Sequence, residues 1–257
     1  MIGCAPRDFC PNLSPYIKQM TYRRHIIGHA HITLLVLAAA LSWPSLSYAV
    51  AGSLRPIEPI FDFGEVGIDY DLHHPFRLVN MGTVPIKIDS AIVTCDCSYV
   101  QLLDSVAQPG DTLTIFLKFN TKDYYGKTSK AIHVYTNENK FTQFDIFYLS
   151  TVGQWFYNLK PTPLNAFFLA AHTEKTITLA NPLVEGLTLS AICHYDTLYT
   201  VTPLQNEADE GEKIEITVTP KPGLKAGTYV SNFRLGFTIP GAVDTLFMSV
   251  PVKIVRY

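Results

Sequence analysis

The sequence has few charged residues and lacks the short motifs that mark common catalytic sites. Charged side chains make up 16% of the 257 residues, and the formal net charge is −2. No basic stretch exceeds two residues, which argues against a nucleic-acid-binding surface. No G-x-S-x-G elbow, H-E-x-x-H pair, P-loop or G-x-G-x-x-G loop occurs. Because no nucleophile, acid and base can be assembled, we predict that the chain is not an enzyme and uses no cofactor.

Long apolar runs are also missing. The longest, residues 32–43, has 12 residues, whereas a membrane-spanning helix needs about 20. This run follows Arg23 and Arg24, and small residues, Ser47 and Ala49, then occupy the −3 and −1 positions of a cleavage site. That order is typical of a secretory signal peptide. We expect cleavage before Val50 and export to the periplasm, the cell surface or the medium, with no stable membrane span in the mature chain. An uncleaved anchor is the alternative.

Residues 1–49 are therefore set apart from the fold. A polar stretch precedes Arg23, and translation from Met20 would give a signal peptide of conventional layout.

The mature part has the composition and pattern of a β protein. Of the 14 Tyr and 15 Phe of the whole sequence, many lie in short runs with Val, Ile and Thr, which favour strands. Apolar residues alternate with polar ones, and turn signals recur every 8 to 12 residues or so, as in β-sandwiches and barrels. No stretch after residue 49 shows a convincing helical period. The predicted fold class is all-β.

Turn and core residues recur at a constant offset of 101 residues. The clearest pairs are Asn80 and Asn181, Gly110 and Gly211, and Gly126 and Gly227. A period of this length indicates a duplicated domain, because solenoid units are shorter. We predict two tandem immunoglobulin-like sandwiches, residues 50–154 and 155–257. The aromatic linker, residues 154–163, is expected to pack at the junction, and no single sheet is expected to run through it.

The first copy carries several short motifs in a familiar order. They are Phe61-Asp62-Phe63-Gly64-Glu65-Val66, Thr94-Cys95-Asp96-Cys97-Ser98, Pro109-Gly110 and Phe119-Asn120-Thr121. This order, from about residue 59 to residue 153, resembles the bacterial domain of unknown function 1573. That family is related to the ASH/MSP/Hydin type of immunoglobulin-like sandwich and is common in exported proteins of the Bacteroidetes. The resemblance implies fold and export but no activity. The second copy has Asp196 and Leu198 where the first has Cys95 and Cys97.

Cys95 and Cys97 are the sharpest chemical feature. On a flat strand they would share one face with Cα atoms about 6.6 Å apart, so a disulfide between them would require a bend. Three interpretations stay open: a structural pair, packed or bridged, on a bent strand; a thiol-redox site; or a soft-metal site such as Cu(I). His73, His74 or His133 would be further metal ligands. The structural role is the one favoured, because free cysteines are usually buried.

Other polar groups are given structural interpretations. Asp62, Asp69 and Asp71 lie near His73 and His74, and a solvated loop is preferred there to a metal site. Cys193 is expected to face the second core, while His172 and His194 are expected at the surface or within satisfied core positions. The predicted function is a non-catalytic binding or structural module whose partner is a protein or a cell-envelope component. The alternatives are a copper or thiol-redox protein that uses Cys95 and Cys97, and a strand-donating protein like the pilus chaperones.

Overall fold

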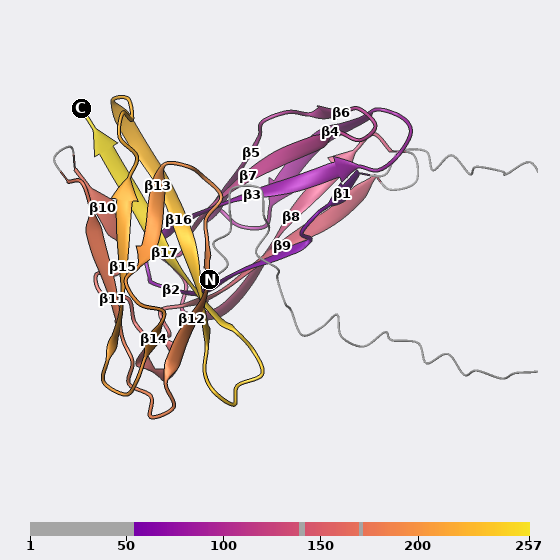
Figure 1. Cartoon of the computed structure of the whole chain (residues 1–257). Helices are drawn as coiled ribbons and strands as arrows, with labels where there is room; N and C mark the ends of the chain where they lie inside the picture. Colours follow the sequence, from indigo (N-terminus) through magenta and orange to yellow (C-terminus); the bar gives the residue numbers. More distant parts are fainter. Residues whose placement is uncertain (1–53, 139–141, 170–171) are drawn as a thin grey trace, which may run out of the picture.

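The computed structural model describes residues 54–138, 142–169 and 172–257 (Figure 1). Nearly all of the regular structure is β, which confirms the predicted all-β class. Strands of the first domain are β1 (Leu54–Pro56), β2 (Ile60–Val66), β3 (Asp71–Asn80), β4 (Ile86–Val93), β5 (Ser98–Leu102), β6 (Val106–Ala107), β7 (Thr112–Asn120), β8 (Gly126–Thr136) and β9 (Gln143–Val152). No helix in these described ranges has the length and apolar character that a membrane crossing requires.

A short 3₁₀ turn, η2 (Phe156–Asn158), leads into the second domain. Its strands are β10 (Ala166–Phe168), β11 (Lys175–Ala180), β12 (Leu187–Cys193), β13 (Tyr199–Pro203), β14 (Glu207–Ala208), β15 (Lys213–Pro220), β16 (Gly227–Thr238) and β17 (Leu246–Arg256). Figure 1 shows the two domains as separate lobes, with β2 lying where they meet.

Each domain is a sandwich around its own apolar core. In the first, the sheet β1-β3-β7-β5 faces strands β2, β9, β8 and β4, and in the second the sheet β11-β15-β13 faces β12, β16 and β17. Alternation explains the packing, because every second residue of β7, from Leu113 to Phe119, is buried. One cluster of buried residues runs from Leu54 to Val152 and the other from Leu159 to Ile254.

The two domains repeat the same hydrogen bonds at the predicted offset. The amide of Asn80 donates to Ala107 O at 3.0 Å, and the amide of Asn181 donates to Ala208 O at 2.9 Å. Gly110 N donates to Asn80 O at 2.8 Å, as Gly211 N does to Asn181 O at 2.9 Å. The asparagine thus ties the end of β3, or of β11 in the second domain, to the short strand β6 or β14 and to the turn after it. Both turn glycines have positive φ angles, 85° and 75°, which L side chains rarely adopt.

Two expectations for the junction were wrong. Strand β2 pairs with β17 in parallel through Glu65 and Met248, so one sheet continues from the first domain into the second. The free edge of β17 accepts β10 at one end and β2 at the other, and an edge covered in this way leaves fewer unpaired backbone groups. Of the linker aromatics, Trp155 packs on the second core, but Phe156 and Tyr157 are 44% and 55% exposed.

Candidate functional site

The outer face of β16 and β17 is covered by the first domain. Asn232 and Arg234 alternate with core residues along β16, a pattern typical of a solvent-facing sheet surface. Nevertheless Asn232 is 4% exposed, Arg234 3% and their neighbour Ser249 on β17 0%. The first domain lies on these residues through β2 and β3. Polar side chains that the sequence places outside a sandwich therefore form the contact between two sandwiches.

Arg234 is the central residue of this contact. Its guanidinium donates a hydrogen bond to Asp62 O. The guanidinium carbon lies 4.7 Å from the centre of the Phe61 ring and 4.2 Å from that of Phe247. Ser249 Oγ donates to Phe63 O at 2.7 Å. A cation between two aromatic faces, bonded to a backbone carbonyl, joins the domains with defined geometry.

Gly64 permits this close approach. Its φ angle is 74°, and a Cβ atom placed there would lie 2.0 Å from Phe247 O. The Asp62 carboxylate accepts the Gly64 N–H at 2.8 Å and fixes the local bend. The Phe-Asp-Phe-Gly-Glu motif of the sequence is thus explained by the way β2 lies against β17.

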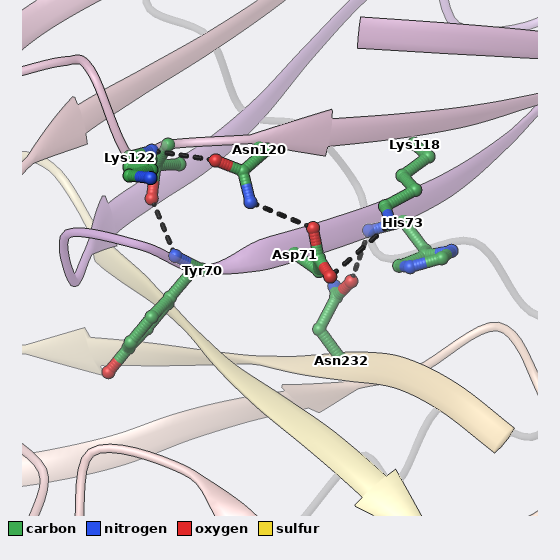
Figure 2. A network of polar contacts seen from close by, with 8 residues as sticks. Tyr70, Asp71, His73, Lys118, Asn120, Lys122 and Asn232 are labelled. Carbon is green, nitrogen blue, oxygen red and sulfur yellow. Dashed lines mark hydrogen bonds and ion pairs between the residues drawn. The ribbon is translucent and has the colours of Figure 1, made fainter. Parts of the chain in front are cut away.

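Two ionisable groups are buried in the same contact. Glu65 is 4% exposed, and burial raises the pKa of its carboxyl to about 7, although a 3.0 Å hydrogen bond from Phe156 N opposes the shift. His73 donates its backbone N–H to Asn232 Oδ1 at 2.6 Å (Figure 2). Both of its ring nitrogens are buried without a hydrogen-bond partner. Burial, reinforced by the Lys118 charge, lowers the pKa of His73 to about 4.

A cavity of about 360 Å³ opens beside this contact. Its wall combines residues of both domains: Asp69, Tyr70, Asp71, Asn165, Phe167, Val230, Pro251, Val252 and Lys253. The strand register explains why three residues of the second domain line the cavity together. Val230, Lys253 and Phe167 lie in one cross-strand row on the outer face of β16, β17 and β10. Cavities of this size at domain junctions commonly hold ligands.

The near side of the cavity is held by the polar network of Figure 2. Asp71 accepts a hydrogen bond from the Asn120 amide at 2.9 Å and lies 3.3 Å from Lys118 Nζ. Burial alone would raise the pKa of the Asp71 carboxyl, but the amide and the ammonium outweigh it and hold the pKa below its ordinary value. Tyr70 N donates to Thr121 Oγ1 at 2.8 Å. The preceding residue, Asp69, has a φ angle of 62°, unusual for a non-glycine residue.

The two cysteines lie in a turn, not on a bent strand as expected. They occupy the connection between β4 and β5, where the chain crosses from one sheet of the first domain to the other. The turn shortens their Cα separation to 5.2 Å, and the sulfurs form a disulfide. This separation lies within the range that disulfides adopt, which a flat strand would not easily give.

Two hydroxyl groups contact this disulfide, and a third is bonded to one of them. Tyr124 donates its hydroxyl hydrogen to Cys97 Sγ at 3.1 Å. Ser98 Oγ lies 3.5 Å from Cys95 Sγ and 3.6 Å from Cys97 Sγ, and it accepts a hydrogen bond from Tyr148 at 2.7 Å. Burial raises the pKa of Tyr148 to about 12, with the Ser98 bond opposing the shift.

The histidines named as further metal ligands contact other groups. His74 Nε2 lies 3.3 Å from a Glu58 carboxylate oxygen, and its ring stacks on Phe61. His133 Nδ1 lies 2.7 Å from Asp145 Oδ1. Among the described residues, no group of three or more His, Cys, Asp or Glu side chains is placed to hold a metal ion.

The remaining predicted positions are at or near the surface. His172 is exposed and accepts Leu169 N at 3.3 Å, while His194 is half-buried and its ring lies 2.8 Å from Asp196 O. Cys193 is only half-buried and not within the core, because the pairing of β12 with β16 shifts register after Leu189.

The architecture defines a two-sandwich protein of the immunoglobulin-like class. Residues 55–147 match the family described as "Protein of unknown function (DUF1573)". The first domain therefore matches the model of this family, as the motif order indicated. No curated protein matches the chain.

Several solved structures are distantly similar. A protein of unknown function from Porphyromonas gingivalis W83 is 14% identical and aligns over 79% of this chain and 99% of its own, with a TM-score of 0.34. SSP-19, an MSP-domain protein like family member in Caenorhabditis elegans, is 16% identical over 38% of this chain and 100% of its own, with a TM-score of 0.32. The periplasmic chaperone SfaE is 10% identical over 80% of this chain and 100% of its own, with a TM-score of 0.32. Similarity at this level identifies no function.

Sequence analysis does not identify the cavity or the docking face, the outer face of β16 and β17 that carries Asn232, Arg234 and Ser249. Asn232 and Arg234 carry the polar alternation of an exposed sheet face, and nothing local distinguishes a face that a second domain covers. Asp71 and His73 lie on β3 and not in the solvated loop expected for this stretch. Their partners are distant in sequence: Asn120 is 49 positions from Asp71, and Asn232 is 159 positions from His73.

Proposed function

We propose that the protein is an exported, non-catalytic binding module whose ligand site is the cavity at the junction of its two domains. The observation that carries the proposal is the composition of the cavity wall, to which each domain contributes polar and aromatic groups. The contacts of Arg234 and Ser249 support it, because they fix the two halves of the wall relative to each other. Binding sites require such preorganised walls.

The charges of the wall favour a ligand with both an amine and a carboxylate. The negative charge of Asp71 is already paired with the ammonium group of Lys118. Asp69 and Lys253 are exposed residues of opposite charge on the wall, and Lys253 Nζ lies 5.9 Å from the centre of the Phe167 ring. We infer a short peptide segment of a partner protein, with a basic and an acidic side chain flanking an apolar one. The ring of Phe167 and Pro251 would contact the apolar side chain.

Titration of the protein with the capped tripeptide acetyl-Lys-Leu-Glu-amide, followed by NMR, tests this function. The expected result is saturable shifts of the amide signals of Asp69, Phe167 and Lys253. The double variant Asp69→Asn, Lys253→Gln should weaken binding by about tenfold or more, the equivalent of about 1.4 kcal/mol. Lys87→Gln with Asp89→Asn, an exposed pair outside the cavity wall, is the matched control and should not change affinity. Absent shifts, or equal loss in both variants, would refute the cavity as the site.

Export is tested separately, by the N-terminus of the mature protein. The copper-binding and strand-donating alternatives stay predictions, because no observation in the described residues favours either of them over the cavity.

A further inference from the structure

The second domain makes the crossing that residues 94–97, the cysteine turn, make in the first, but without a disulfide between its two sheets. In the first domain Asn120 N donates to Cys97 O at 2.8 Å, and at the 101-residue offset Lys221 N donates to Leu198 O at 2.8 Å. The carboxylate of Asp196 holds the second turn by accepting Leu198 N at 3.0 Å. One chain thus contains both versions of the turn. A covalent bond is not required for the crossing between the sheets, and the cysteine pair calls for another explanation.

The hydroxyl groups around Cys97 Sγ favour the reduced form of this sulfur. A disulfide sulfur is neutral and a weak hydrogen-bond acceptor, so Tyr124 gains little by donating to Cys97 Sγ at 3.1 Å in the oxidised state. A thiolate at the same position would accept a charge-assisted bond, which is about twice as strong. The Ser98 hydroxyl, 3.6 Å from the same sulfur, adds a second donor. Lys130 Nζ, 4.5 Å from the centre of the Tyr124 ring, adds positive charge.

The two sulfurs differ in position. Cys97 packs against the first core with Tyr124, whereas Cys95 is not among the residues packed on that core. Asp96 between them is exposed. Both cysteines are half-buried. Because Cys97 is the one held against the core and beside Tyr124, we take Cys95 as the sulfur that an incoming thiolate attacks and Cys97 as the sulfur that leaves. This is the arrangement that thiol–disulfide exchange requires, since a stabilised leaving thiolate speeds the reaction.

We propose that Cys95–Cys97 is a thiol–disulfide exchange site that oxidises a dithiol of a partner protein. A thiolate of the partner attacks Cys95 Sγ, the bond between Cys95 and Cys97 breaks, and its electron pair remains on Cys97 as a thiolate that accepts the Tyr124 hydrogen bond. The second thiol of the partner loses its proton to solvent, attacks the mixed disulfide and releases Cys95 as a thiolate. The partner loses two electrons and gains a disulfide, while this chain gains two electrons. The activity is independent of the cavity.

Exchange kinetics with dithiothreitol as the dithiol probe test the proposal. Reduction of the oxidised protein would be followed by alkylation and mass spectrometry from pH 6 to 9. Tyr124→Phe should slow reduction by about tenfold, the loss of one charge-assisted hydrogen bond, and should shift the pH profile of the released Cys97 thiol upward. Tyr99→Phe, which alters a tyrosine that is 63% exposed on β5, is the matched control and should leave the rate unchanged.

A second variant separates exchange from a structural role. Cys95→Asp with Cys97→Leu copies the turn of the second domain and should remain folded, with an unfolding midpoint in urea close to that of the unaltered protein, but it should not react. Unfolding of this variant, or equal reduction rates for Tyr124→Phe and the unaltered protein, would overturn the proposal and leave the disulfide a structural bond.

Discussion

Lowering the pH should destabilise the protein through His73. The ring lies between Phe116, whose ring centre is 5.7 Å away, and the second domain, to which the backbone N–H of His73 is bonded through Asn232. Its two nitrogens have no partner that would share a positive charge. Burial and the Lys118 charge both oppose that positive charge, and together they outweigh Asp71, which favours it. Protonation therefore places an unsatisfied charge in the contact between the domains.

The size of the effect follows from the two pKa values. The imidazole has a pKa of about 4 in the folded protein and 6.5 when exposed. Since the unfolded chain binds the proton more tightly, the contribution of His73 to stability is complete above pH 6.5 and is lost as the pH falls toward 4. Each pH unit in this window is worth about 1.4 kcal/mol, so the full loss is about 3 kcal/mol. That is a large part of the stability of an ordinary domain.

His73→Phe keeps a ring against Phe116 and removes the titration. Urea unfolding of the protein and of the variant at pH values from 4 to 7.5 should show a stability difference that moves in favour of the variant by about 3 kcal/mol as the pH falls. His172→Phe, at an exposed position, serves as the control, and its difference from the unaltered protein should not change with pH. Parallel pH profiles for His73→Phe and the unaltered protein would show that the buried ring does not resist protonation.

Three further results are expected. Glu65→Gln should become more stable relative to the unaltered protein as the pH rises. The pKa of the carboxyl is about 7 in the folded protein against 4.5 when exposed, so ionisation destabilises the fold between these values. Urea unfolding at pH 4.5 and 8 measures the difference. Gly64→Ala should cost at least about 2 kcal/mol, since its Cβ would clash with Phe247 O. Gly110 has a similar φ angle, but a Cβ atom added there would meet no atom within 4 Å, so Gly110→Ala should cost less in the same unfolding assay. N-terminal sequencing of exported protein should begin at Val50, and retention of residues 32–43 would contradict a cleaved signal peptide.

The fold could be predicted because its determinants are local and repeated. Alternation along β7 marks the core face, and turn glycines such as Gly110 and Gly211 bound the strands. The offset of 101 residues then gives two sequences for each strand, so a strand with an ambiguous pattern in one copy can be assigned from the other. Strand β13, for example, lies 101 residues after β5 from its first residue to its last.

The site could not be predicted because its determinants are not local. Whether Arg234 faces water or the first domain depends on the docking of β2, which pairs with β17 through Glu65 and Met248 alone. The cysteine geometry was mispredicted for a related reason. Alternation was extended through residues 94–97, whereas the chain there leaves one sheet for the other and turns. A change of sheet has no periodic signal in the sequence.

The duplication makes the two domains controls for each other, and two of their differences bear on the sites described above. At the 101-residue offset, Asn232 and Arg234 of the docking face correspond to Ala131 and His133, and the cysteine turn corresponds to a turn closed by Asp196. Positions that only maintain a sandwich should be kept in both copies, as Asn80 and Asn181 are with their matching bonds. Residues that differ where both copies still form a sandwich are not needed for the sandwich itself. They are needed for what one copy alone does: the second domain presents a polar face for docking, and the first presents a disulfide with hydroxyl donors. Exchange of the two turns between the domains would separate the chemistry of each turn from its place in the fold.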